Sequence, residues 1–159
     1  RCWPWTAHGD STTLALVGDA AHAIVPFYGQ GANCAFEDAI AIDELIERHD
    51  GDWTAVLDAY EQVRKPNTDA IADMALENFV EMRDRVNSRL FRAKRRAMHA
   101  LERMLPGLVV SRYELVSFST VPYAQVVRRM RTQRRWLAVA GAAATALAGA
   151  VLVVTLYVR

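Results

Sequence analysis

The stretch LVGDAAHAIVPFYGQGANCAFEDA, residues 16–39, decides what kind of fold this 159-residue chain adopts. An apolar run at residues 13–17 predicts a short strand that ends at Gly18-Asp19. After a turn of small residues, two glycines flank Gln30, and residues 31–48 then repeat apolar side chains at helical spacing. The sequence therefore predicts a strand, a loop and a helix start in direct succession.

This loop has the residue types of a ligand site. A strand ending in Gly-Asp can aim the carboxylate of Asp19 from the carboxyl edge of a sheet, where open α/β sheets bind ligands. Gly29 and Gly31 let the backbone approach a ligand closely, and the amides of Ala32 and Asn33 at the helix start favour an electron-rich group. The third glycine of the dinucleotide fingerprint is missing. These residues indicate a site for a polyhydroxylated, partly anionic cofactor.

Residues 136–158 form a segment of 23 residues without a charged side chain. As a helix it would extend about 34 Å, enough to cross the roughly 30 Å hydrocarbon core of a bilayer. The alternative is a buried core helix, but a small domain rarely encloses one that is so long and apolar on every side. The sequence predicts a transmembrane helix.

Arginines gather on one side of this span, while Arg159 alone follows it. They are Arg128, Arg129, Arg131, Arg134 and Arg135. The positive-inside bias places the preceding part of the chain on the cytosolic side, and the basic cluster is typical of a membrane-surface anchor. Gly141, Thr145 and Gly149 recur every four residues, so helix pairing in a homodimer is a hypothesis.

Helices fill most of the chain between loop and span. Asp50-Gly51-Asp52 ends the first helix, residues 53–63 predict a second, and Pro66 suits the first turn of a third. The third helix is expected to run to Met104 without an internal break, before Pro106-Gly107 stops it. Its apolar positions are Ile71, Met74, Phe79, Met82, Val86, Leu90, Met98 and Leu101. Residues 108–122 are irregular or weakly strand-like, and residues 123–135 lead into the span.

Charge and cysteine content exclude several classes of function. The net charge of +1 points to no acidic partner, and the eight basic residues against two acids between Arg83 and Arg103 suit a solvated helix face. Cys2 and Cys34 have no metal or redox spacing, so a reducing compartment and no metal site are expected. We expect His22 to pack within the loop and Cys34 to be a small packing residue.

The residues GDAAHAIVPFYGQGANCAFEDA, 18–39, resemble the second flavin motif of the FAD-dependent aromatic hydroxylases, with Gly-Asp-Ala-Ala-His followed by Pro, Gly-Gln-Gly, Asn and Glu-Asp. ALENFVEMRDRV at 75–86 and RYELVSFSTVPYAQV at 112–126, with the basic stretch and span behind them, resemble the kynurenine 3-monooxygenase family over essentially the whole chain. The resemblance implies a mostly α fold with a short β contribution. It would be the C-terminal part of an α/β FAD-binding monooxygenase fold with a C-terminal transmembrane helix.

The resemblance divides the chain into three parts. Residues 1–50 would be the C-terminal piece of the FAD-binding domain, residues 51–135 a helical module beside the substrate and the membrane, and residues 136–158 the transmembrane helix. It assigns FAD contacts to Asp19, Pro26, Gly29, Gly31, Ala32 and Asn33. Asp19 would contact the ribityl side, the amides of Ala32 and Asn33 the pyrimidine edge, and Pro26 would line the flavin.

The same resemblance assigns substrate contacts to Phe27, Tyr28, Asn78, Glu81, Met82 and Tyr113. Phe27 and Tyr28 would wall the aromatic substrate, and Asn78 and Tyr113 would hold its amino-acid end by hydrogen bonds. Spacings of three and four residues place Asn78, Glu81 and Met82 on one helical face. Tyr28 stands where the family has phenylalanine or histidine, and Ala32 where methionine is common, so the pocket shape is expected to differ.

The implied reaction is hydroxylation of L-kynurenine to 3-hydroxykynurenine, with FAD as cofactor and NADPH and O2 as co-substrates, in tryptophan degradation. The glycine-rich dinucleotide motif and the carboxylate-binding arginine and tyrosine of the family are absent from these residues. We therefore expect no hydroxylation by this chain alone. Two other interpretations stay open: a related membrane-bound FAD hydroxylase or epoxidase acting on a quinone, phenol or polyene precursor, and a non-catalytic membrane-anchored helical module.

Overall fold

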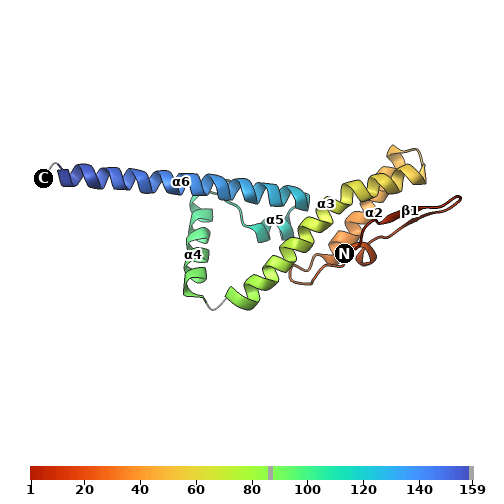
Figure 1. The fold of residues 1–159 in the computed structure, drawn as a ribbon, viewed down its shortest axis with the longest axis horizontal. Coiled ribbons are helices and arrows are strands. Elements are labelled where there is room, and N and C mark those ends of the chain that lie inside the picture. The colour runs from red at the N-terminus through yellow and green to blue at the C-terminus, as the bar shows by residue number, and fades with distance from the viewer. Residues whose placement is uncertain (86–87, 158–159) are drawn as a thin grey trace.

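The chain is mostly helical, with one small hairpin near its N-terminus (Figure 1). The computed structural model describes residues 1–85 and 88–157. Strands β1 (Thr6–His8) and β2 (Thr13–Ala15) pair antiparallel, with Thr6 opposite Ala15 and His8 opposite Thr13. The strand predicted at 13–17 is present but ends two residues early, and its partner β1 is too short to leave a pattern in the sequence.

The loop after the hairpin leads through a short helix, α1 (Asp19–His22), to α2 (Gly31–Arg48), whose predicted bounds are confirmed. α2 stops where Asp50 and Gly51 adopt positive φ angles of 49° and 78°. Asp52 then caps the next helix, since its carboxylate accepts hydrogen bonds from the amides of Thr54 and Ala55. The turn that the sequence predicts at residues 50–52 therefore reverses the chain and packs α2 against α3.

Helix α3 (Trp53–Val80) runs straight through Pro66, so the predicted break at that residue is wrong. A proline inside a helix removes one backbone donor. Here Asn67 donates from Nδ2 to the carbonyl of Val63, and the Thr68 hydroxyl donates to the carbonyl of Lys65. Neither bond reaches the carbonyl of Gln62, which loses its helical donor at Pro66, so the packing of α3 on α2 is what stabilises the helix through the proline.

The predicted continuous helix to Met104 is also wrong. α3 passes into a π-helical turn, η1 (Glu81–Arg85), and a separate helix α4 (Arg89–Met104) begins at Ser88, whose hydroxyl accepts from the amide of Phe91. Val86, counted in the predicted pattern, lies outside the described residues. A serine three residues before the amide it caps was the sequence signal for this start.

Residues 112–118 form helix α5 (Arg112–Phe118) instead of the irregular or strand-like segment expected there. The hydroxyl of Ser111 accepts from the amide of Glu114 and caps the helix. Leu115 and Val116 are buried against α3 and α6. Burial of these two adjacent side chains favours the helix over the β preference of a short apolar run.

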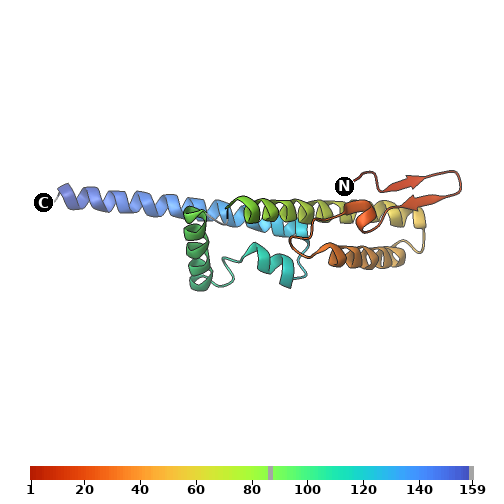
Figure 2. The same cartoon turned by 90° about the horizontal axis from the view of Figure 1, so that it is seen from below.

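Helix α6 (Tyr123–Tyr157) contains both the arginine cluster and the predicted span. Its first part packs on α3 and α5, and the rest extends alone beyond the other elements (Figures 1 and 2). Every described side chain from residue 138 to 157 is exposed, so the chain does not enclose this segment as a core helix. By length and composition α6 can cross a membrane. Val158, the predicted end of the span, lies outside the described residues.

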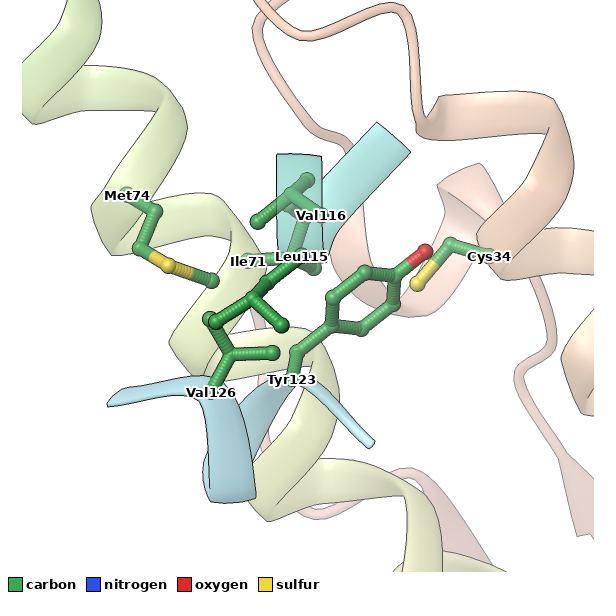
Figure 3. Close-up of a cluster of buried hydrophobic side chains, with 7 residues drawn as sticks. All are labelled: Cys34, Ile71, Met74, Leu115, Val116, Tyr123 and Val126. Atoms are coloured by element: carbon green, nitrogen blue, oxygen red, sulfur yellow. The ribbon is translucent and has the colours of Figure 1, made fainter. Parts of the chain in front are cut away.

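Two buried clusters hold the loop of residues 18–31 in place. One joins the hairpin region to α1, α2 and α3 through Trp5, Ala21, Leu45, Val56 and Tyr60. The other joins α2, α3, α5 and α6 through Cys34, Ile71, Met74, Leu115, Val116, Tyr123 and Val126. In Figure 3 the ring of Tyr123 reaches from α6 toward Cys34 on α2. The loop is thus fixed from both sides of α2.

Candidate active site

A buried carboxylate organises the turn that carries Asp19. Asp38 of α2 has no exposed surface, and its Oδ2 accepts from the amide of Gly18 at 3.0 Å and lies 2.5 Å from His22 Nε2. Its Oδ1 accepts from Arg64 Nε at 2.7 Å. Burial by itself would raise the pKa of Asp38, but the hydrogen bonds from His22, Arg64 and Gly18 outweigh burial and hold that pKa below its ordinary value. The carboxylate therefore stays charged and ties both ends of the turn to α2.

Arg64 of α3 completes this buried network. Its guanidinium donates to Glu37 Oε2 at 2.7 Å and to the carbonyl of Cys34 at 3.1 Å. Burial opposes its charge, yet the bonds to Asp38 and Glu37 raise the pKa of Arg64. Burial also raises the pKa of the Cys34 thiol to about 12, so it is a neutral packing residue as expected. His22 is 1% exposed and lies 5.4 Å from the Trp5 ring, which agrees with a packing role.

Asp19 lies one residue beyond this anchor and is exposed at the start of α1. Gly18, in front of it, is buried at a φ of 63°, where a side chain would be strained. An added Cβ at Gly18 would also lie 3.5 Å from the Cβ of Ala35. Gly18 thus packs against α2, while Asp19 presents its carboxylate to solvent.

The Gly29-Gln30-Gly31 turn is held from inside by its glutamine. Gln30 is 6% exposed, and its Oε1 accepts from Asn33 Nδ2 at 2.8 Å and from the Tyr123 hydroxyl at 3.2 Å. A Cβ added at Gly29 or Gly31 would meet nothing within 4 Å. The turn therefore anchors through its side chain and leaves its backbone facing open space.

The first turn of α2 adds hydrogen-bond donors beside that open backbone. The amides of Gly31, Ala32 and Asn33 have no acceptor within the helix by its geometry, and Ala32 and Asn33 are exposed. Exposed Pro26 adds an apolar surface in the same loop. Helix amides, an exposed carboxylate and a bare glycine backbone fit a planar, electron-rich group that carries hydroxyls. The residues present therefore fit FAD.

The predicted substrate contacts come together from three separate segments. Asn78 of α3 donates from Nδ2 to the carbonyl of Phe27 at 2.9 Å and lies 3.9 Å from Met82 Sδ. Tyr28 stacks with Tyr113 of α5 at 6.2 Å between ring centroids. The loop after α1 and the helices α3 and α5 thus share one region, with Phe27 at its flavin-loop side.

Two residues that the sequence interpretation missed connect this region. Arg112 donates to Glu77 Oε2, lies 3.8 Å from Glu81 Oε2, and places its guanidinium 6.0 Å from the centre of the Tyr28 ring. Phe79 packs on Phe27 at 4.6 Å between ring centroids. Both lie inside the quoted motifs, but their partners are distant in sequence, so adjacency to Tyr113 and Asn78 was the available signal.

An open groove of about 550 Å³ lies between α3 and α6. It is lined by Asp73, Leu76, Glu77, Val80, Glu81 and Arg134. Glu77 and Glu81 thus line the groove and also lie beside Arg112. Arg134, from the arginine-rich part of α6, lines the same groove as these two glutamates.

The chain is similar to one family model and to several known proteins. Residues 8–75 match the family model described as an FAD binding domain. The chain is 52% identical over 120 residues to "Kynurenine 3-monooxygenase" of Myxococcus xanthus, covering 76% of this chain and 25% of that relative. The protein of the same name from Salinispora arenicola is 44% identical over 149 residues, covering 94% and 32%, respectively.

A eukaryotic relative shows the same similarity. "Kynurenine 3-monooxygenase" of Dictyostelium discoideum is 50% identical over 123 residues, covering 70% of this chain and 27% of the relative. The chain thus spans 25 to 32% of the length of these relatives. With the FAD-type loop and the matched FAD binding domain, these identities show that the chain belongs to the kynurenine 3-monooxygenase family of flavin-dependent monooxygenases.

Proposed function

We propose that this chain supplies the flavin-side loop and the substrate-side helices of an enzyme that hydroxylates L-kynurenine to 3-hydroxykynurenine with NADPH and O2. The observation that carries the proposal is the hydrogen bond from Asn78 to the carbonyl of Phe27. It joins the loop that fits FAD to the helix that bears the predicted substrate contacts. A planar substrate beside Phe27 would therefore lie next to the flavin-side backbone.

The chain's residues would hold FAD by complementary hydrogen bonds. The exposed carboxylate of Asp19 would accept hydrogen bonds from hydroxyls of the ribityl chain, and the exposed amides of Ala32 and Asn33 would donate to the pyrimidine edge. Bound FAD supplies the redox chemistry that activates O2. The positive end of α2 would favour negative charge at that edge, and Pro26 would line the flavin from the loop.

The substrate side offers an aromatic wall and polar contacts for an amino acid. Phe27 and Tyr28 would flank the aromatic ring of the substrate, Met82 would fill the adjoining space, and Asn78 and Tyr113 would bind its amino-acid end. Phe27 packs on Phe79, Tyr28 stacks with Tyr113, and Asn78 lies beside Met82. Arg112 pairs with Glu81 and lies over the ring of Tyr28, so it would orient both side chains. Burial raises the pKa of Tyr28, and this outweighs the opposite effect of Arg112. The phenol therefore stays neutral.

The membrane part of the proposal concerns α6. Residues 136–158 would cross the bilayer once, with the arginines before them and the catalytic part on the cytosolic side. In this proposal the chain has three parts, the FAD-side residues 1–50, the helical module of residues 51–135 and the span of residues 136–158. Close pairing of two copies through Gly141, Thr145 and Gly149 would make a homodimer in the membrane.

The test uses the full-length protein that contains this chain. We expect L-kynurenine to stimulate NADPH oxidation with stoichiometric formation of 3-hydroxykynurenine, and the 159-residue chain alone to form none. Asp19→Ala should weaken FAD binding about tenfold, as expected for loss of a charge-assisted hydrogen bond, while Asp10→Ala in the exposed hairpin turn leaves it unchanged. Turnover of a quinone or phenol without any response to kynurenine would contradict the assignment of kynurenine as the substrate. Absence of bound flavin in the full-length protein would contradict the assignment of a flavin-dependent enzyme.

A further inference from the structure

Helix α4 carries an exposed apolar stripe. Leu90, Ala93, Ala97, Ala100 and Met104 recur at intervals of three and four and are all exposed, with Leu90 at 80% and Met104 at 76%. This spacing places them along one side of the helix. Among the α4 side chains that the structure describes, none is buried. The stripe therefore faces away from the protein along the whole helix.

Arginines border this stripe. Arg89, Arg96 and Arg103 are seven residues apart, which puts them in one row beside the apolar positions, and all three are exposed. Arg92 and Arg95 continue the basic face and are exposed as well. A basic face adjoining an apolar stripe is the pattern of helices that lie in the membrane interface and bind anionic lipid headgroups.

The end of α4 is fixed to α6 just before the apolar span begins. The carbonyl of Gly107 accepts from Arg129, and Val110 exchanges two hydrogen bonds with the side chain of Gln133, at 3.1 and 3.3 Å. Gln133 is only 4% exposed. These contacts hold the turn after α4 within about two helical turns of Trp136, the first residue of the uncharged segment.

The direction of α4 follows from both ribbon views. α4 stands crosswise to α6, and past α4 only α6 continues (Figures 1 and 2). A helix crosswise to a transmembrane helix, placed where the span begins, lies along the bilayer surface. The exposed stripe, the arginine row and this orientation all fit a helix that lies on the bilayer surface.

We infer that α4 is an in-plane membrane helix that docks on the leaflet that α6 enters, with its stripe at the headgroup boundary and its arginines on anionic lipid. The inference rests on the proposal that α6 spans a bilayer. A second copy of the chain fits the stripe less well, because the arginine rows of two facing helices would repel each other. Docking of α4 would hold the region of Asn78 and Arg112 at the membrane surface.

The test is nitroxide labelling of the full chain in vesicles of phosphatidylcholine and phosphatidylglycerol. Single cysteines are placed by Leu90→Cys, Met104→Cys and Arg92→Cys on the stripe and basic face, and by Leu147→Cys in α6, with exposed Cys2 replaced by serine. We expect the ratio of oxygen to nickel-chelate collisions to be at least about threefold higher at Leu90 and Met104 than at Arg92, since lipid excludes the chelate.

A charge-deleted chain with Arg89→Gln, Arg96→Gln and Arg103→Gln should lose this difference, as should the parent chain in pure phosphatidylcholine vesicles. A Leu90 label open to the chelate, or shielded from both reagents by protein, overturns the inference while a deep Leu147 label leaves the span intact. A Leu147 label open to the chelate overturns the membrane proposal itself. Immersion of Leu90 that is unchanged by the arginine replacements overturns the assignment of anionic headgroups.

Discussion

Asp38 Oδ2 and His22 Nε2 lie 2.5 Å apart in the interior, with at most 1% of either side chain exposed. The contact joins the Gly-Asp-Ala-Ala-His turn to α2, and Arg64 joins the same carboxylate to α3. One buried charge therefore connects the loop that presents Asp19 to both helices that support it. Changes at this carboxylate should affect the whole site.

Asp38→Asn should lower the free energy of unfolding by about 3 kcal/mol or more, because it leaves the Arg64 charge buried with a single carboxylate partner. Urea unfolding followed by circular dichroism measures the change. Asp43→Asn, at an exposed position of the same helix, is the matched control and should change stability by less than about 0.5 kcal/mol. Equal effects of the two substitutions would contradict the role of the buried network.

The same carboxylate predicts a pH dependence. Because the folded-state pKa of Asp38 is lowered, its contribution to stability is complete above the unfolded-state pKa of about 3.9 and is lost as the pH falls through the folded-state value. Below about pH 4 the parent chain should therefore lose stability more steeply than Asp38→Asn. Unfolding midpoints recorded from neutral to acid pH give the two slopes, and parallel slopes would refute the prediction.

Arg64→Lys should destabilise the chain by about 2 to 4 kcal/mol, since one ammonium cannot replace the fork that serves Asp38, Glu37 and the Cys34 carbonyl. Arg48→Lys tests the same replacement in an exposed pair with Glu44 and should change stability by no more than about 0.5 kcal/mol. Thermal unfolding of both variants under one condition makes the comparison direct.

The two glycines of the flavin-side turn should respond differently to alanine. Gly29 has a φ of 67°, so Gly29→Ala should cost about 1 kcal/mol of stability even though its Cβ meets no atom. Gly31 is outside that region of φ, so Gly31→Ala should leave stability nearly unchanged and weaken FAD binding by filling the open space. Chemical unfolding and flavin titration of the full-length protein separate the two effects.

Asn78→Asp should raise the KM for kynurenine about tenfold in the full-length protein, since a carboxylate cannot donate to the Phe27 carbonyl and repels it. Steady-state kinetics with product detection measures the change. Gln62→Glu makes the same amide-to-acid replacement at an exposed position of α3 and should leave KM unchanged. An unchanged KM for Asn78→Asp would show that Asn78 does not contribute to substrate binding.

Tyr123→Phe should weaken FAD binding about fivefold, because Gln30 loses one of the two donors that hold its carboxamide, worth about 1 kcal/mol. Tyr157→Phe, in the exposed part of α6, is the matched control. Flavin fluorescence titration gives both dissociation constants. Identical constants would show that the Tyr123 hydroxyl does not support the turn.

Local patterns were sufficient where a residue's neighbours in sequence decide its conformation. The bounds of α2 follow from helical periodicity between Gly31 and the turn at Asp50-Gly51, and the flavin motif by itself identifies the loop and the exposure of Asp19. The uncharged stretch from Trp136 likewise predicts a helix able to span a membrane, since that depends on length and composition. These features need no knowledge of how distant segments pack.

Tertiary structure decided what depends on residues far apart. α3 continues through Pro66 because it packs on α2, and α5 is helical because Leu115 and Val116 are buried in a core. Arg112 reaches Glu77, 35 residues earlier, and Tyr123 reaches Gln30 across 93 positions. The sequence by itself determined which loop can hold a flavin, while folding decided which side chains support that loop, because burial and hydrogen-bond partners exist only once the helices have packed.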